Sequence, residues 1–166
     1  MPNALPHEPR LTQALRTLLT TQRVAALGTL AQDGHPFVSM VPFAIDPVAA
    51  SVVIHVSGLA LHTRNLQRSP AVSLLVMQAE VPEEPVHALP RVTLEGIATV
   101  LLADTAAWAD GRAAYLARFP EAQPMTELGD FMFVGIQILG ARQVAGFGAA
   151  RSLDASHIAQ VLRPHG

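Results

Sequence analysis

The sequence predicts a mainly β protein, a six-stranded antiparallel barrel with helices at its periphery. Six apolar runs of strand length are joined mostly by short polar turns, a pattern that is typical of barrels. Strands and helices do not alternate regularly and no G-x-G-x-x-G motif occurs, so a Rossmann dinucleotide fold is not expected. At 166 residues, the length suits a single domain, residues 1–166, with a sizeable core.

The N-terminal half is expected to contain one helix and three strands. Leucines at helical spacing predict a helix over residues 9–21, within an N-terminal segment of residues 1–22. Strands are expected at residues 23–30, 35–45 and 51–56. Gly34 can adopt the positive φ that the first turn requires. Pro36 and Pro42 have no N–H group to donate to a central ladder, so they predict an edge strand or a bulge.

The C-terminal half is expected to contain three further helices and three further strands. The helices are predicted at residues 59–68, 104–118 and 154–162, and the strands at residues 71–79, 92–102 and 131–139. Asp104 is expected to cap the helix that follows it, and Gly96 to mark a bulge or a barrel corner. Residues 146–148 are expected to form a tight turn, and residues 154–166 the C-terminal helix and tail.

Composition excludes several classes of protein. Half of the residues are hydrophobic and 14% are charged, so the chain is expected to fold. A net charge of −2 argues against a nucleic-acid surface. No apolar run approaches the roughly 18 residues that span a bilayer, and the polar start is unlike a signal peptide. These features predict a cytoplasmic protein without membrane partners. Low charge with high apolar content also predicts a homodimer that hides apolar surface.

The basic residues limit the chemistry that this chain can perform. There is no cysteine, and all eleven basic residues are arginine. Without lysine, the chain cannot form a Schiff base with pyridoxal phosphate. A bound phosphate must be held by arginine, histidine, hydroxyl or backbone N–H groups, and the planar fork of arginine suits this task.

A polar cluster after the third predicted strand indicates an anionic ligand. Its members lie within nine positions, at the start of the short helix predicted at residues 59–68: Ser57, His62, Thr63, Arg64 and Asn65. The first N–H groups of a helix have no partner within the helix and attract negative charge. The sequence therefore predicts a small phosphorylated ligand. The alternative is that these residues only cap the helix.

The order of the motifs resembles the pyridoxamine 5′-phosphate oxidase-like family of FMN-binding split β-barrels, and within it the haem-utilisation branch. The matching motifs are R-x-x-x-L-x-T at residues 23–29, D-G-x-P-x-x-S at 33–39, S-x-L-A-x-H-T-R-N-L at 57–66, S-P-x-V-S-L-L at 69–75, L-G-D-F-M at 128–132 and G-F-G-x-A at 146–150. The resemblance implies an FMN-binding split barrel, a homodimer that completes the cofactor site at the subunit boundary, and a possible flavin-dependent oxidoreductase.

The resemblance also implies which residues contact FMN. They are Arg23, Ser39, Ser57, His62, Thr63, Arg64 and Arg91. His62 stands where the family more often has lysine, and a neutral histidine brings no net charge to a phosphate. Arg23 has an alternative role at a helix C-terminus, and Arg91 at a solvated strand end. No catalytic residue is identified.

The haem-utilisation branch implies a different ligand. Haem needs only one axial histidine, and the resemblance points to a histidine near the C-terminus, His165 or His157, with Asp130 nearby. The seven histidines show no paired metal-ligand spacing, so no dedicated metal site is expected. Arg163 and His165 match an R-x-H pair of true pyridoxamine-phosphate oxidases, but their surroundings do not, so vitamin B6 oxidation is not expected. Three hypotheses remain: an FMN-dependent oxidoreductase, a haem-binding or haem-degrading protein, and a non-enzymatic binding module.

Overall fold

A computed structural model describes residues 8–164 of the chain. Within that range the protein has eight strands and four α-helices, with two 3-10 helices. In chain order the elements are α1 (Arg10–Thr21), β1 (Val24–Leu30), β2 (Pro36–Pro42), β3 (Ala44–Asp46), β4 (Ser51–Ser57), α2 (Leu61–Arg68), β5 (Ala71–Met77), η1 (Val86–Ala88), β6 (Arg91–Val100), α3 (Ala106–Arg118), η2 (Pro120–Glu127), β7 (Phe131–Val144), β8 (Ala150–Asp154) and α4 (Ala155–Leu162).

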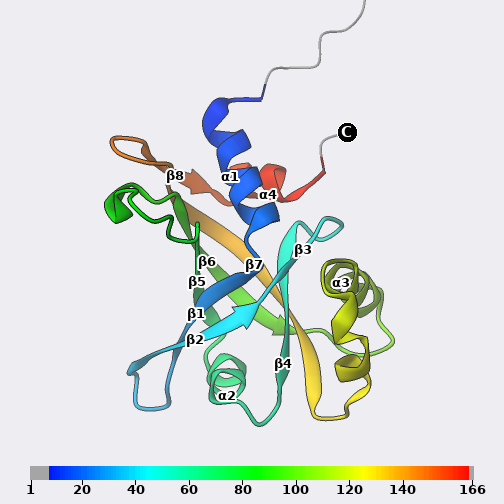
Figure 1. Ribbon diagram of the computed structural model, residues 1–166. Helices are drawn as coiled ribbons and strands as arrows, with labels where there is room; N and C mark the ends of the chain where they lie inside the picture. Colours follow the sequence, from blue (N-terminus) through cyan, green and yellow to red (C-terminus); the bar gives the residue numbers. More distant parts are fainter. Residues whose placement is uncertain (1–7, 165–166) are drawn as a thin grey trace, which may run out of the picture.

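The strands form one antiparallel sheet that curls into a split barrel (Figure 1). Their order is β2-β1-β5-β6-β7-β4-β3, and β8 pairs with β7. The two ends of this order are consecutive in the chain, because only Phe43 separates β2 from β3. Among residues 8–164, β2 does not pair with β4, so a split remains between these two strands. The predicted split-barrel class is confirmed, with eight strands in place of six.

The inward-facing side chains fill the barrel with apolar atoms. Alternate residues of β1 and β5 are buried, among them Leu27 and Leu74. Every residue of β4 from Ser51 to Val56 is buried, because α3 covers the outer face of this strand. A second, smaller core therefore lies between α3 and the sheet, where Tyr115 and Phe133 pack together. Burial on both faces explains why β4 is mostly apolar and does not alternate with polar residues.

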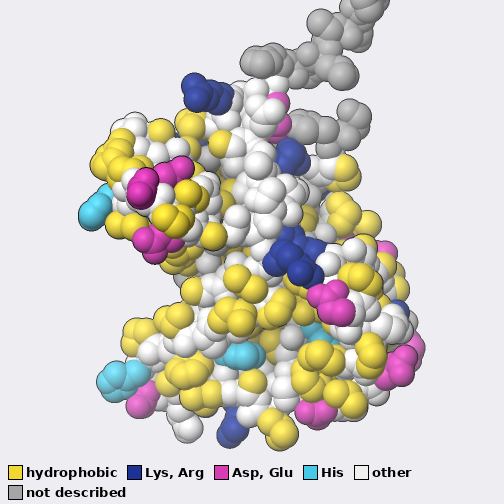
Figure 2. Space-filling view, in the orientation of Figure 1, with side chains coloured by type: hydrophobic (Ala, Val, Ile, Leu, Met, Phe, Trp, Pro, Cys, Tyr) yellow, Lys and Arg dark blue, Asp and Glu magenta, His cyan; other side chains and the backbone are white. Residues whose placement is uncertain are grey.

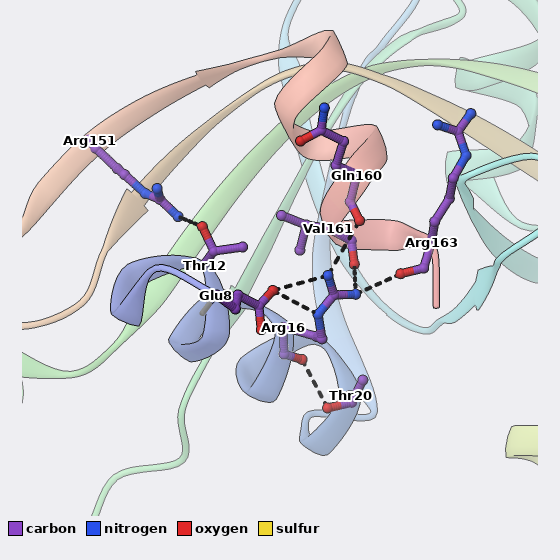
Figure 3. A network of polar contacts seen from close by, with 8 residues as sticks. All are labelled: Glu8, Thr12, Arg16, Thr20, Arg151, Gln160, Val161 and Arg163. Atoms are coloured by element: carbon purple, nitrogen blue, oxygen red, sulfur yellow. Dashed lines mark hydrogen bonds and ion pairs between the residues drawn. The ribbon is translucent and has the colours of Figure 1, made fainter. Parts of the chain in front are cut away.

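The helices close the two ends of the barrel. At one end, the lower one in Figure 1, α2 packs against β1 and β6. The buried side chain of Asn65 donates there from Nδ2 to the Thr29 hydroxyl at 3.1 Å. At the other end α1 lies beside α4, and the Arg16 guanidinium bonds to carbonyl groups of the last turn of α4 (Figure 3). We call these the α2 end and the α4 end of the barrel.

Several predicted turns and bends are confirmed. The φ angle of Gly34 is +83°, and those of Gly146 and Gly148 are +133° and +70°. The strand that contains Pro36 and Pro42 lies at an edge of the sheet, as their missing N–H groups required. The register between β6 and β7 shifts at Gly96, which confirms the predicted bulge.

Other expectations were wrong. Residues 35–45 form two strands, because the chain bends at the fully buried Phe43. The strand predicted at residues 131–139 continues to Val144, and β8 was not predicted. Asp104 does not cap α3: the cap is Thr105, whose hydroxyl accepts a hydrogen bond from the Trp108 N–H at 3.2 Å. Across residues 8–164, every helix is too short or too polar to cross a membrane.

Candidate functional site

Most of the residues predicted to contact a ligand lie together at the α2 end of the barrel. The chain leaves β4 at Ser57 and enters α2 four residues later. This short connection brings the end of β4 and the first turn of α2 next to β2 and to the start of β7. The group consists of Ser39, Ser57, His62, Thr63, Arg64 and Asp130, and we call it the α2-end cluster.

His62 contacts the barrel through a hydrogen bond to β2. Its Nδ1 lies 3.0 Å from the Ser39 hydroxyl, and both residues are half-buried. Burial lowers the pKa of His62 below its ordinary value of 6.5, so the imidazole is neutral at pH 7. Within residues 8–164 the other ring nitrogen, Nε2, makes no hydrogen bond, and it is not fully buried. A neutral imidazole with one oriented and one open nitrogen can accept a proton or bind a metal ion.

Ser57 and Asp130 form the second part of the cluster. The Ser57 hydroxyl donates to Asp130 Oδ2 at 3.1 Å, and the Gly58 N–H donates to the Asp130 carbonyl at 2.6 Å. The Thr63 hydroxyl donates to the Ser57 carbonyl at 2.7 Å. Because Thr63 is fully buried, its side chain fixes α2 against β4 and is not open to a ligand. Asp130 is exposed and therefore offers a free carboxylate edge to one.

Positive charge is sparse in this cluster. Arg64 is exposed, and one of its terminal nitrogens donates to the Leu59 carbonyl at 3.0 Å. Arg23 lies at the far end of β1, where it pairs with Glu121 at 2.8 Å and covers the Phe119 ring. Arg91 lies at the far end of β6, where it donates to the Leu89 carbonyl at 3.0 Å. Of the three arginines that the resemblance named for FMN, the cluster contains only Arg64.

The two candidate haem ligands near the C-terminus are not part of the cluster. His157 lies in α4 at the other end of the barrel, and its Nδ1 is 2.9 Å from Asp154 Oδ1. Asp154 pairs with Gly140 of β7, whereas Asp130 immediately precedes that strand. Ten residues of strand separate these positions, roughly 30 Å at the usual rise per residue. His165 lies outside the described residues.

His55 was not predicted as a site residue, although it lies two positions before Ser57 on the same face of β4. Its ring is 8% exposed and stacks on Phe131 at 5.1 Å between centroids, with Phe133 at 4.5 Å. Burial lowers its pKa, and Nδ1 is enclosed without a hydrogen-bond partner. Side chains two positions apart in a strand point to the same side. From the sequence, this spacing alone could have suggested that His55 lies on the same side of β4 as Ser57. The aromatic rings around His55 make it part of the second core.

A groove of about 360 Å³ lies at the α4 end, between α1 and the ends of β5, β6 and β7. Its polar lining includes Gln13, Gln78 and Gln143, and it has no histidine. Gln143 already donates to the Leu11 carbonyl and accepts from Arg151, so its amide is occupied. Within residues 8–164, no three histidine or acidic side chains converge on a possible metal position.

The α2-end cluster offers little positive charge for the phosphate of FMN. A phosphate carries up to two negative charges and favours several cations or N–H donors, but His62 is neutral and Arg64 is the cluster's only arginine. Haem iron can bind an imidazole nitrogen as its axial ligand. Leu59 and Leu61, in the connection to α2 and at its first position, are exposed. Figure 2 shows hydrophobic side chains over much of this end of the molecule.

Comparison with known proteins identifies a family and several relatives. A family model described as pyridoxamine 5′-phosphate oxidase matches residues 11–145. The chain is 37% identical over 140 residues to the chloroplastic heme oxygenase HOZ of Arabidopsis thaliana, covering 83% of this chain and 41% of that protein. It is 30% identical over 142 residues to heme oxygenase HutZ of Vibrio cholerae, covering 85% and 80%. The structure of a heme binding protein from Mycobacterium smegmatis superposes with a TM-score of 0.81 at 29% identity, covering 93% of this chain and 62% of that one. The chain thus spans less than half of HOZ.

Proposed function

This chain belongs to the pyridoxamine 5′-phosphate oxidase family, and we propose that it is a haem-binding member whose ligand is haem and not FMN. The proposal rests mainly on the protonation and hydrogen bonding of His62 in the α2-end cluster. The cluster presents a neutral imidazole with an open Nε2 where an FMN phosphate would need positive charge. The names of the relatives support the same ligand, since two are heme oxygenases and one is a heme binding protein.

The residues of the cluster suit the handling of haem in two ways. Haem supplies an iron that binds an imidazole nitrogen and can activate oxygen. His62 offers the nitrogen, held in place by Ser39. Asp130 offers an exposed carboxylate, oriented by Ser57, that can accept a hydrogen bond or a proton. We propose that haem is degraded on this protein when an electron donor is present, as the names of HOZ and HutZ suggest for those proteins.

The FMN-dependent oxidoreductase has less support. The family match allows it, but Arg23 is paired with Glu121 and Arg91 lies at the opposite end of β6. A flavin site in this chain would therefore depend on Arg64 and on backbone N–H groups of α2. Weak FMN binding is the expected result.

We also propose that the protein is a homodimer that pairs through the outer face of β1, β2 and β5. Val38 and Met40 are 66% and 65% exposed there, and Val24 lies on the same face. Isolated apolar side chains are common on surfaces, but a contiguous apolar sheet face usually marks an interface. A stable interface needs about 800 Å² from each partner. A second copy of the chain, related by a two-fold axis, would present the same face to this one.

Titration separates haem from FMN. Haemin added to the purified protein is expected to give a saturable Soret band, whereas FMN fluorescence is expected to change little over the same range. A saturable flavin signal without a Soret band would overturn the proposal. Ascorbate and oxygen, added to the haem complex, are then expected to bleach the Soret band as the ring is opened. A Soret band that stays stable under those conditions would refute haem degradation, while the proposed haem binding would stand.

A further inference from the structure

The groove at the α4 end has fixed walls, because α1 is held to the barrel at both of its ends. In the first turn of the helix, the carbonyl of Leu11 accepts a hydrogen bond from Gln143 of β7 at 2.9 Å. In the last turn, the Arg118 guanidinium donates to the carbonyl of Leu19 at 3.1 Å. The groove of about 360 Å³ lies beside the part of α1 that these contacts hold. Its volume falls in the range of about 300–1,000 Å³ that is usual for preformed small-molecule sites.

One side of α1 forms a wall of this groove and takes no part in packing. The buried residues Leu15 and Leu19 attach the helix to the core. The groove side lies on another face of the helix, where four exposed residues recur at helical spacing: Arg10, Ala14, Thr17 and Thr21. Because the fold does not depend on burying these side chains, they are open to a ligand.

The polar side chains of the groove differ from those that fasten α1. Within residues 8–164, the carboxamides of Gln13, Gln22 and Gln78 make no hydrogen bond with the protein, although all three line the groove. A carboxamide has both an acceptor oxygen and a donor NH₂ group, so it can pair with an amide in a ligand. The guanidinium of Arg10 has no acidic partner in the described part of the chain. The groove therefore offers one positive charge and several open amide groups.

The rest of the lining limits the class of ligand. Leu18, Pro90 and Val144 supply apolar surface. No histidine or acidic residue is among the described residues that line the groove, so neither a haem iron nor an ammonium group finds a partner there. An arginine without an acidic neighbour favours a carboxylate, which its planar group can bind through two hydrogen bonds. A small molecule with one carboxylate, one amide and a short apolar chain matches all of these features.

We propose that the groove at the α4 end is a second binding site, and that it takes an N-acylated amino acid with an apolar side chain. Arg10 binds the carboxylate, the open glutamines bind the amide, and the apolar lining covers the side chain. The site lies at the opposite end of the barrel from the α2-end cluster. The inference goes beyond the proposed haem binding and does not depend on it, so each can fail without the other.

The test titrates N-acetyl-L-leucine into the full chain without haem and follows the backbone amide signals by nuclear magnetic resonance. Saturable shifts are expected at Thr17 and Ala145, which line the groove, and none at His62 in α2. N-acetyl-L-leucinamide lacks the charge, and 4-methylpentanoate lacks the amide. Each is expected to bind roughly tenfold more weakly, since each loses hydrogen bonds that the groove can make. Equal binding of all three compounds would overturn the proposed recognition.

Two variants place the ligand in the groove. Arg10→Met is expected to bind N-acetyl-L-leucine as weakly as N-acetyl-L-leucinamide, because the two compounds differ only at the carboxylate. Ala14→Leu fills the groove with a good helix former and is expected to abolish the shifts while the protein stays folded. Arg163→Met is the matched control, since Arg163 is also exposed at the α4 end but does not line the groove. Parental affinity in both groove variants, or no saturable shift in the parent, would overturn the inference.

Discussion

The guanidinium of Arg16 lies 2.7 Å from the carbonyl oxygen of Arg163, although 147 positions separate the two residues in the chain. The same group also donates to the carbonyls of Gln160 and Val161, and Glu8 holds it from the other side at 3.1 Å (Figure 3). The last carbonyls of a helix have no partner within it. A side chain of α1 therefore caps the C-terminus of α4 and fixes the first helix to the last.

Arg16→Met is expected to lower the free energy of unfolding by about 2 kcal/mol, because it removes the charged donor to the last carbonyls of α4. The methionine preserves most of the apolar stem, so the loss reports the guanidinium. Arg10→Met is the matched control, since Arg10 lies exposed on the same helix. Urea unfolding of the two variants and the parent measures the difference. Equal stability of both variants would contradict the capping role.

Gly96→Ala is expected to cost about 2 kcal/mol or more of stability. An added Cβ would lie 2.5 Å from the Gln137 carbonyl oxygen and 2.8 Å from Ile136, so the bulge between β6 and β7 must shift. Gly129→Ala provides the comparison, because a Cβ there meets no atom within 4 Å. Thermal unfolding should place Gly129→Ala near the parent and Gly96→Ala several degrees lower. Similar melting temperatures would show that the bulge relaxes easily.

His55→Phe is expected to raise stability at pH 8 by about 1 kcal/mol, because it removes the enclosed Nδ1 and keeps an aromatic ring among Phe131 and Phe133. The substitution also changes how stability depends on pH, because burial lowers the pKa of His55 in the folded protein. Above the unfolded value of 6.5 the imidazole is neutral in both states, so pH has no effect through this group. Below it the unfolded chain gains the proton first, so stability falls until the pH passes the lower, folded pKa.

The variant should therefore reduce the loss of stability as the pH falls below 6.5. A residual slope is expected from His62, whose pKa is lowered by the same cause. Glu121 and Asp154 have lowered pKa values as well, so their contribution is lost only at more acidic pH. Denaturant melts at pH 8, 6 and 5 give the slopes. An unchanged slope in His55→Phe would mean that His55 is protonated equally in both states.

Met40→Glu is expected to convert the proposed dimer into a monomer, because it places a charge in the middle of the apolar face of β1, β2 and β5. Leu102→Glu is the matched control: Leu102 is 69% exposed and does not lie in these strands. Light scattering reports the mass, with 17.6 kDa for one chain. A parent that already scatters as a monomer would refute the dimer, and a dimeric Met40→Glu would place the interface elsewhere.

Local chemistry made much of the fold predictable from the sequence. Gly34, Gly96 and the two prolines of β2 have conformations or hydrogen-bonding limits of their own, so their positions in turns, bulges and edges could be predicted. The bend at Phe43 could not, because residues 37–45 read as one apolar run. The two less exposed positions of β8 hold Arg151 and Leu153, so the sequence shows no alternation of apolar residues there. Its existence depends on pairing with β7.

The candidate site was predictable where its residues are close in sequence. Ser57 to Arg64 lie in one segment, and the structure keeps them together. Ser39 and Asp130 lie far from this segment in the sequence, and only the resemblance to a family indicated that they belong to the site. Arg23 and Arg91, which the resemblance named for FMN, lie apart from the cluster within one protomer, because each begins a strand whose far end is the one near α2. Which end of a strand lies near which helix depends on the register and direction of pairing, and a single sequence does not contain that information.

The passage from β2 to β3 through Phe43 has a topological consequence. The ring of the barrel is complete only because the main chain runs from one edge of the sheet to the other at this point. Arg16 and its partners meanwhile hold the first and last helices side by side. A circular permutant that joins the two ends by a linker and opens the chain at Phe43 would therefore retain every strand pair. It would nevertheless lose the covalent closure of the barrel and leave the split free to widen.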